Sequence, residues 1–383
     1  MKILILGGDG YLGWPTSLYF SARDHDVYIL DNFVKKKIEL ENGIKNLIHQ
    51  PPLSERVKLW NSNNKKKIKS FTCDLLNHRL LYDILDEIRP EVVIHYAEQP
   101  SAPYSMKGRE ACIFTQHNNV IGNLNLLFGM KKYCPDAHLI KLGTMGEYGT
   151  PNIDIEEGWL EIVHNGRKDR LLYPKKPGSF YHLSKVHDSH NIEFACRIWD
   201  LKCTDLNQGV VYGINTKEIG NEEGLATSFH YDEIFGTVIN RFVTQASLGL
   251  DLTVYGEGTQ ERGYLNINDT MKCVELSALN PPKKGEFRVF NQYTETFTIN
   301  DIAKKVLEAS QELDISIQAK KIENPRIEQQ NHYYNPTNKS LINLGLKHVE
   351  LNNSLIKDLI KKIKNYSNNV IRDTLSPKIK WKK

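Results

Sequence analysis

The sequence predicts an α/β fold in which a doubly wound parallel sheet is followed by a smaller C-terminal α/β domain. Short apolar runs alternate with helical patterns through roughly the first half of the chain, as in a parallel sheet with crossover helices. The first run ends in a glycine-rich turn. At 383 residues the chain also exceeds the size at which a single core stops growing, so two domains are expected.

The first unit reads as strand, turn and helix, with a strand at 2–6 and a helix at 12–23. Between them, Gly7 permits a tight turn, Gly10 lets the backbone approach a pyrophosphate, and Gly13 lets the helix pack on the strand. The helix N-terminus then faces the phosphates. This pattern is typical of a Rossmann dinucleotide-binding unit.

The second strand, 27–30, ends at Asp31, where the adenine ribose hydroxyls of a dinucleotide would be held. A carboxylate there repels a 2′-phosphate, which favours NAD over NADP. Lys35, Lys36 and Lys37 follow and argue the opposite, but three adjacent lysines more often form a solvated face. NAD is therefore the expected cofactor.

Further strands are expected at 68–72, 92–96 and 139–142, with a long helix at 111–133 between the last two. Asp74 follows the first of these strands and either meets the adenine or serves as a turn residue. Residues 97–99 follow the second, at the sheet edge where α/β proteins bind ligands.

Tyr181 and Lys185 stand four residues apart and share one face of a predicted helix. A cation beside a phenol favours the phenolate, which lowers the tyrosine pKa and permits general-base catalysis. Alone, this spacing more often marks a solvated pair on a helix surface. Together with the glycine loop and Thr144, which follows a predicted strand, it predicts hydride transfer.

The remaining chain is less regular. The segment 143–179 is a long proline-containing loop, which we interpret as a lid over a site. We place the NAD-binding domain at 1–208, with segments near 235–255 returning to it, and a mainly substrate-binding domain at 209–383. The elements expected in the second half are strands at 202–208, 252–255 and 288–290 and helices at 235–248, 268–279, 300–313 and 351–371, the last docking on its own domain rather than on a membrane.

Composition excludes several classes of protein. The balance of 50 basic and 46 acidic side chains lacks the basic excess of a nucleic-acid binder. Six dispersed cysteines have no zinc spacing, so no metal site is expected. No apolar run is long enough to span a membrane. Because a strand begins at Lys2, we expect no targeting peptide and a cytoplasmic protein.

Five longer motifs extend the comparison with known families: QHNNVIG at 116–122, KLGTMGEYGTPNID at 141–154, FYHLSKVHDSHN at 180–191, DLNQGVVYG at 205–213 and WKK at 381–383. In these motifs the chain resembles the extended short-chain dehydrogenase/reductase superfamily, whose members include NAD-dependent epimerases and dehydratases. Within it, the chain is similar to the UDP-sulfoquinovose synthases of sulfolipid biosynthesis.

The resemblance implies synthesis of UDP-sulfoquinovose from UDP-glucose and sulfite with a tightly held NAD. Tyr181 would take the proton of the glucose 4-hydroxyl as hydride leaves C4, while Thr144 bonds the same hydroxyl and Lys185 lowers the tyrosine pKa and bonds the nicotinamide ribose. The C4 ketone acidifies C5, water is lost across C5 and C6, sulfite adds at C6, and hydride returns to C4. Relatives also pair the helices at 111–133 and 180–200 across a homodimer.

The chain departs from the sequences of related enzymes in two places: one concerns the acid and base of elimination, and the other concerns the site for sulfite. Dehydratases place an Asp-Glu pair directly after the threonine, whereas Met145 and Gly146 stand here, followed by Glu147. We expect Glu147 and His182 to share proton transfer at C5 and C6, although His182 could equally be a helix histidine bonded to a carbonyl.

Plant-type members have arginine between the residues equivalent to Gln99 and Ser101, where this chain has Pro100. If that arginine holds sulfite or a phosphate, Arg241 or Lys141 would have to replace it. Arg262 and Arg326 lie near glycine or proline and could clamp a diphosphate, although surface solvation is the common fate of an arginine.

The motifs and the resemblance together assign three sets of residues. The expected catalytic residues are Thr144, Tyr181, Lys185, Glu147, His182 and Met145. The expected NAD-binding residues are Gly7, Asp9, Gly10, Tyr11, Leu12, Gly13, Asp31, Asn32, Lys36, Asp74, Leu75, Asn119, Tyr181 and Lys185. The expected substrate-binding residues are Gln99, Thr144, Gln208, Arg241, Tyr255, Arg262 and Arg326. A UDP-sugar 4-epimerase and a non-catalytic NAD-sensing protein are the alternative functions.

Overall fold

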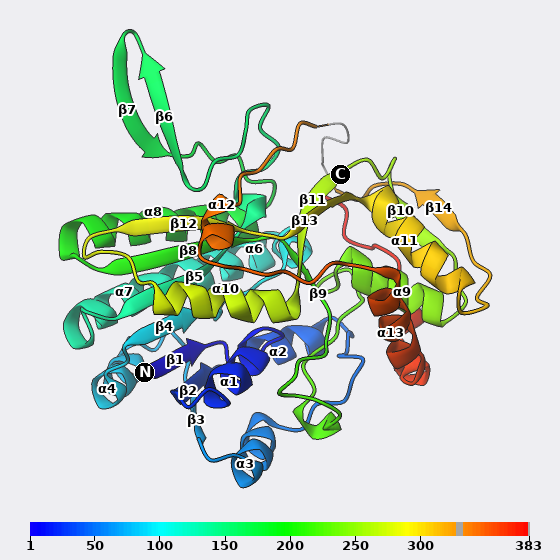
Figure 1. The fold of residues 1–383 in the computed structure, drawn as a ribbon, viewed down its shortest axis with the longest axis horizontal. Coiled ribbons are helices and arrows are strands. Elements are labelled where there is room, and N and C mark those ends of the chain that lie inside the picture. Colours follow the sequence, from blue (N-terminus) through cyan, green and yellow to red (C-terminus); the bar gives the residue numbers. More distant parts are fainter. Residues whose placement is uncertain (327–331, 382–383) are drawn as a thin grey trace.

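A seven-stranded parallel sheet forms the centre of the computed structural model, which describes residues 1–326 and 332–381 (Figure 1). The strand order is β12-β8-β5-β4-β1-β2-β3, and the chain reverses direction across the sheet between β1 and β4. The strands are β1 (Lys2–Leu6), β2 (Asp26–Asp31), β3 (Ile68–Thr72), β4 (Val92–His95), β5 (His138–Thr144), β8 (Lys202–Gln208) and β12 (Phe287–Gln292). The predicted doubly wound sheet is confirmed.

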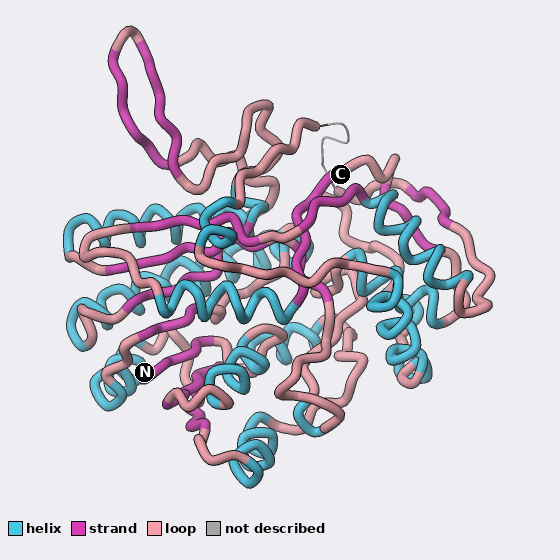
Figure 2. Tube along the Cα trace, viewed as in Figure 1, coloured by secondary structure: helices cyan, strands magenta, loops and turns pink. Residues whose placement is uncertain are grey.

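Helices cover both faces of this sheet, as Figure 2 shows. One face packs against α1 (Gly13–Ser21), α3 (Leu53–Asn63), α10 (Ile267–Leu279) and α12 (Lys339–Asn343), and the other against α4 (His78–Ile88), α7 (Gly122–Tyr133) and α8 (Phe180–Trp199). The central strands β1, β2 and β4 are almost continuously apolar, as expected for parallel strands that are buried on both sides, whereas β5 and β8 also bury polar residues such as Lys141 and Asp205.

The predicted long helix at 111–133 is one rod in three parts. It runs through α6 (Arg109–Gln116), a π-helical segment (His117–Ile121) and α7. The π segment carries Asn118 and Asn119, whose side chains are buried. Single π turns inside helices are frequent at functional sites, because the extra residue re-aims the side chains around it.

The C-terminal part has its own core around two small sheets, β9-β11-β13 and β10-β14. Its elements are β9 (Val210–Tyr212), α9 (Val238–Ser247), β10 (Leu252–Tyr255), β11 (Glu261–Asn266), β13 (Glu295–Thr298), α11 (Ile299–Gln311), β14 (Ala319–Ile322) and α13 (Asn353–Lys364). The last helix buries Ile356, Leu359, Ile360 and Ile363, so it docks on its own domain, but it ends at Lys364 rather than near residue 371.

Two segments after residue 208 differ from the expected division of the chain. The segment near 235–255 packs with α11 and α13 in the C-terminal core, although we expected it to return to the NAD-binding part. In contrast, β12 pairs with β8 and extends the central sheet. The domain boundary itself stays a prediction.

The segment 143–179 forms a hairpin instead of a lid. Strands β6 (Trp159–His164) and β7 (Arg167–Leu172) pair with each other, and Figure 1 shows them projecting away from the body of the molecule. Residues 145–179 are all described, and none of them lines the cavity at the sheet edge or the second cavity beside it. The lid interpretation is therefore wrong for this conformation.

Shorter elements complete the fold: α2 (Val34–Glu41), α5 (Ala102–Ser105), and single helical turns at Met145–Glu147, Glu223–Leu225, Ser367–Asn369 and Arg372–Thr374. Lys382 and Lys383 of the terminal motif lie outside the described residues. In the described ranges, no helix is long and apolar enough to cross a membrane.

Candidate active site

A cavity of about 390 Å³ opens at the carboxyl edge of the sheet, over the reversal between β1 and β4. Its floor is the glycine turn. Gly7 has a φ of 83°, and a Cβ on Gly13 would lie 2.0 Å from the Gly7 carbonyl oxygen, so neither position accepts a side chain without strain. A backbone surface this bare at a helix N-terminus fits the pyrophosphate of a dinucleotide.

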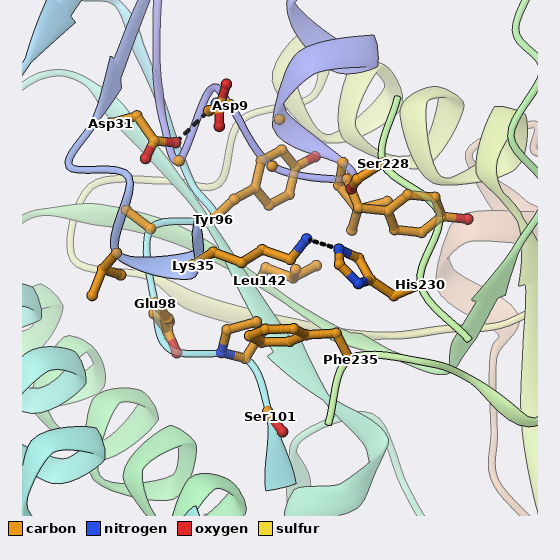
Figure 3. A pocket seen from close by; sticks show the side chains of 18 of the residues that line it. Asp9, Asp31, Lys35, Tyr96, Glu98, Ser101, Leu142, Ser228, His230 and Phe235 are labelled. Atoms are coloured by element: carbon orange, nitrogen blue, oxygen red, sulfur yellow. Dashed lines mark hydrogen bonds between the residues drawn. The ribbon is translucent and has the colours of Figure 1, made fainter. Parts of the chain in front are cut away.

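The acidic end of the cavity is built by β2 and the glycine turn (Figure 3). The Asp31 carboxylate accepts hydrogen bonds from the backbone N–H groups of Asp9 (2.8 Å) and Phe33 (2.7 Å). Burial nevertheless raises the pKa of Asp31, against the effect of those bonds. Its carboxylate lines the cavity, where a ribose hydroxyl could donate to it.

Asp9 is held by two cations, only one of which we expected at this site. Lys36 Nζ lies 2.8 Å from Asp9 Oδ2, and Arg56 pairs with the other oxygen. Arg56 is completely buried on α3, stacked 4.6 Å from the Trp14 ring, and burial lowers its pKa. The sequence contains no local sign of this role, because Arg56 lies 47 residues from its partner in an ordinary helix.

Most residues expected to bind NAD line this cavity: Gly7, Asp9, Gly10, Tyr11, Leu12, Gly13, Asp31, Asn32, Lys36, Asp74, Leu75 and Tyr181. Asn119 and Lys185 lie behind the wall. The Asn119 side chain accepts from Gln99 N (2.9 Å) and donates to Ser184 Oγ (2.9 Å), so it fixes the loop after β4 to α8.

The predicted catalytic groups meet at the end of β5. Thr144 ends that strand, and Tyr181 and Lys185 come from the first turns of α8; Thr144 and Tyr181 line the cavity. Lys185 Nζ donates to the Leu142 carbonyl oxygen (2.6 Å) and lies 2.5 Å from Glu98 Oε2. Thr144 and Tyr181 therefore lie together at the cavity, with Lys185 behind them, and their catalytic roles stay a prediction.

The expected effect of Lys185 on Tyr181 is not observed. Burial raises the pKa of Tyr181, and the nearby Glu98 carboxylate raises it further. The ammonium group of Lys185 is already paired with Glu98, so its field at the phenol is largely cancelled. Residues 97–99 were expected at this edge of the sheet, but no role was assigned to Glu98, which lies on the cavity wall beside the predicted catalytic pair.

Glu147 is a fully buried residue that holds Thr144. Its carboxylate accepts from the Thr144 backbone N–H (3.2 Å) and pairs with Lys175, while Lys141 Nζ lies 3.5 Å away. Burial alone would raise the pKa of Glu147, but Lys141 and Lys175 outweigh it and bring the pKa to about 2. Glu147 does not line the cavity, so in this conformation it positions the threonine.

His182 occupies the space that the second acid of a dehydratase would need. A Cβ on Gly146 would lie 2.4 Å from His182 Nε2, so the imidazole packs directly over that glycine. Its Nδ1 lies 3.0 Å from Ser179 Oγ. Met145 is buried beside it, and neither His182 nor Met145 is part of the cavity wall.

The predicted substrate residues divide between two places. A second cavity of about 230 Å³ is lined by Arg241, Tyr255, Arg262 and Arg326, and it shares wall residues such as Thr237 with the first. Gln208 lines the first cavity. Gln99 lines neither cavity; its side chain is buried and bonded to Ser101 and Thr115.

The two cations expected to hold sulfite, Lys141 and Arg241, also lie in different places. Lys141 is enclosed by Glu147 and Asp205 and does not reach a cavity. Figure 3 instead shows Lys35, from the run interpreted as a solvated face, joined to His230 across the cavity, with 2.7 Å between the two nitrogens. The charge pattern around Lys35 did not reveal this, because its partner lies 195 residues away.

Residues 3–291 match the model of the NAD dependent epimerase/dehydratase family. Over 382 residues the chain is 47% identical to the chloroplastic UDP-sulfoquinovose synthase of Spinacia oleracea, covering all of this chain and 79% of that protein. It is 39% identical over 386 residues to the UDP-sulfoquinovose synthase of Sulfolobus acidocaldarius, covering 100% and 98%. The chain belongs to the UDP-sulfoquinovose synthase family.

Solved structures support the fold of this UDP-sulfoquinovose synthase family member. A UDP-glucose 4-epimerase from Thermotoga maritima, solved with UDP-glucose, has a TM-score of 0.68 at 20% identity and covers 95% of this chain and 99% of that one. MoeE5, solved with UDP-glucose and NAD, has a TM-score of 0.67 at 16% identity, with coverage of 98% and 100%.

Proposed function

We propose that this chain forms UDP-sulfoquinovose from UDP-glucose and sulfite, using bound NAD. The observation that carries the proposal is the convergence of Thr144, Tyr181 and Lys185 on one end of a cavity whose other end is a glycine cradle with Asp31. The full-length similarity to two UDP-sulfoquinovose synthases supports it. NAD, when bound, would accept hydride from the sugar and later return it.

The chain's own residues would handle the proton of the 4-hydroxyl. Thr144 and Tyr181 line the cavity and would bind that hydroxyl, with Tyr181 as the base. Lys185, anchored on the Leu142 carbonyl, would bind a ribose hydroxyl of the cofactor while it keeps its contact with Glu98. Its ammonium group would stabilise negative charge on Tyr181 as the proton moves.

We assign proton transfer at C5 and C6 to His182, whose side chain would have to turn towards the substrate, because it does not line the cavity in this conformation. Its imidazole fills the place over Gly146, and Ser179 at Nδ1 orients the ring. Glu147 would support the reaction by holding Thr144. The C4 ketone makes the C5 proton acidic, so a neutral imidazole is a sufficient base.

The second cavity would take the uridine diphosphate. Arg241 lies 3.9 Å from the Tyr255 ring centroid, and its Nη2 donates to the Thr253 carbonyl (2.9 Å), so the guanidinium is held rigidly. Arginines bind diphosphates through two parallel hydrogen bonds. For sulfite, Lys35 is the better candidate, because it reaches the first cavity and Lys141 does not.

The proposal predicts a homodimer built from α6, α7 and α8. These helices expose Ile113, Ile121, Phe128, Phe180, Phe194 and Ile198, an unusual density of large apolar side chains on one layer. Strict preference for NAD over NADP, which rests on Asp31, and a cytoplasmic location are further parts of the proposal.

Incubation of the purified protein with UDP-glucose and sulfite tests the function. The expected product is a sulfonated UDP-hexose, identified by mass, and Tyr181→Phe should lower its rate by about 10²-fold or more. UDP-galactose as the sole product would instead identify a 4-epimerase. Bound NAD without any sugar turnover would identify an NAD-sensing protein.

A further inference from the structure

A closed cluster of charged side chains lies directly behind the Tyr181–Lys185 pair. None of its side chains is more than 3% exposed. It contains three ammonium groups and four carboxylates, contributed by β5, α8 and the segments around them: Lys141, Lys175, Lys185, Glu98, Glu147, Asp188 and Asp205. The proposed mechanism uses only Lys185 and Glu147 from this set.

All members except Asp188 form one continuous network, in which Lys141 Nζ donates to the Lys185 carbonyl oxygen (3.1 Å). Lys141 Nζ lies 3.5 Å from both Glu147 Oε1 and Asp205 Oδ2. Ser189 Oγ bridges the same two carboxylates at 3.1 and 2.7 Å. A Cβ on Gly143 would lie 2.4 Å from Asp205 Oδ1, so a glycine is required there for the acids to approach the strand.

Asp188 is the member that structural packing does not explain. It is fully buried, and among the described residues neither of its carboxylate oxygens has a hydrogen-bond partner. An ionised carboxylate in that state is costly, so Asp188 is the member of the cluster with the strongest tendency to take up a proton. Consistent with this, burial and the nearby Glu98 raise the pKa of Asp188.

The charges of the cluster do not cancel. Four carboxylates against three ammonium groups leave one negative charge when all are ionised. His95, which faces Lys141 across β4 and β5, does not neutralise it, because burial and the two lysines lower the pKa of His95 to about 3. The other titratable groups facing the cluster are Tyr148, Tyr181, His190 and Cys203.

Glu98 connects this cluster to the cavity, since it lines the cavity wall and pairs with Lys185. We propose that the cluster is an internal proton store: it receives the proton of the sugar hydroxyl during oxidation and returns it during re-reduction, without exchange with solvent. The inference rests on the proposed function, in which the same carbon is oxidised and later reduced.

The proton steps balance. The substrate O–H bond breaks and its proton joins Tyr181 oxygen, the Tyr181 proton passes to the Lys185 amine, and Lys185 has by then given a proton to the Glu98 carboxylate. Tyr181 and Lys185 end as they began, and one carboxyl of the cluster has gained a proton. Burial raises the pKa of Glu98, although Lys185 and Lys141 oppose it, so this carboxyl can hold the proton.

Electroneutrality favours the same arrangement. An oxidised nicotinamide ring carries one positive charge that a reduced ring lacks. In a water-poor cavity, the ionised cluster matches the charged ring and the singly protonated cluster matches the neutral ring. The protonation state of the cluster should therefore change with the oxidation state of the cofactor.

The direct test is a single turnover with UDP-glucose in the absence of sulfite, with an indicator dye in weakly buffered solution. We expect NADH to form without release of a proton, and the amount formed to change less than about two-fold over one pH unit. Release of one proton per NADH would overturn the store, because the equilibrium would then shift about tenfold per pH unit.

Two variants test the residues. Glu98→Gln and Asp188→Asn each leave equal numbers of carboxylates and ammonium groups, so the cluster has no charge left to neutralise. Each variant should release about one proton per NADH formed. Glu157→Gln, a half-buried carboxylate bonded to Ser340 on the far side of β12, is the matched control and should behave as the wild type.

Calorimetry supplies a readout that needs no turnover. Binding of NADH and of NAD to cofactor-stripped protein is measured in two buffers of different ionisation enthalpy. NADH binding should take up about one proton more than NAD binding, and an equal proton count would overturn the store even if the variants fail to fold. Absence of NADH in the turnover experiment, in contrast, would count against the proposed function and leave the calorimetric result to decide the store.

Discussion

Gly13 is the residue with the least tolerance for change in the cofactor cradle. Gly13→Ala would place a methyl group 2.0 Å from the Gly7 carbonyl oxygen, in backbone that cannot move without displacing β1 or α1. We expect a loss of about 1–3 kcal/mol in the free energy of unfolding and loss of bound NAD, measured by urea denaturation and by the absorbance of released nucleotide.

Gly178→Ala is the matched control, because a Cβ there would meet nothing within 4 Å. Its effect on the free energy of unfolding should stay within about 0.5 kcal/mol. If Gly13→Ala retained full NAD content, the close contact between the two glycines would not govern cofactor binding.

Glu147 should stabilise the protein in a pH-dependent way. Its pKa is about 2 in the folded protein against an ordinary value of 4.5, so its stabilisation is complete above pH 4.5 and is lost as the pH falls towards 2. Glu147→Gln should therefore cost on the order of 3 kcal/mol at neutral pH, and less in acid. Urea denaturation at several pH values measures the difference, and a pH-independent cost would contradict this account.

Single residues could be predicted where their chemistry depends on near neighbours in the chain. The glycine turn, Asp31, Thr144 and the Tyr181–Lys185 pair were found this way, and they lie where expected. The roles of Arg56, Lys35 and Glu98 could not be predicted, because their partners are tens to hundreds of residues away. A sequence pattern carries no information about which distant charge a buried side chain will meet.

At the scale of elements, periodicity located nearly every strand of the central sheet and most helices within a few residues. It failed for 143–179, where β6 and β7 form a hairpin in which β6 is mostly apolar and β7 mostly charged, with exposed Val163 and Leu171. Such residues alternate too weakly to indicate a strand. Long loop length alone suggested a cover, but it did not indicate the direction in which the segment points.

The hairpin tip should be dispensable for chemistry. Replacing 161–170 with a short Gly-Ser linker keeps Trp159 and Leu172, which pack against the core. Because no hairpin residue lines a cavity, we expect kcat/KM for UDP-glucose to stay within about two-fold of the wild type. A fall of tenfold or more would restore the lid interpretation, and unchanged thermal unfolding would show that the shortened chain still folds.

At the scale of the whole molecule, the alternation of strands and helices was sufficient to predict the sheet, because parallel strands need crossover helices and one hand of connection. Membership of β12 in that sheet could not be predicted, since 78 residues of other structure separate it from its neighbour β8. Only the pairing of β12 with β8 shows that the C-terminal half of the chain contributes a strand to the central sheet.

The apolar layer formed by α6, α7 and α8 makes a prediction about assembly. Phe194 is 51% exposed and Ile198 44%, and both lie on α8 beside exposed residues of α6 and α7, which is a large apolar area for a monomer to leave in water. The wild type should sediment with twice the mass of one chain, and the double variant Phe194→Glu, Ile198→Glu as a single chain, because charges buried without partners oppose association.

Ile342→Glu, at a 53% exposed site on α12, is the control and should leave the dimer intact. A wild type that sediments as one chain at every concentration would contradict the assignment and leave the exposed layer to another partner.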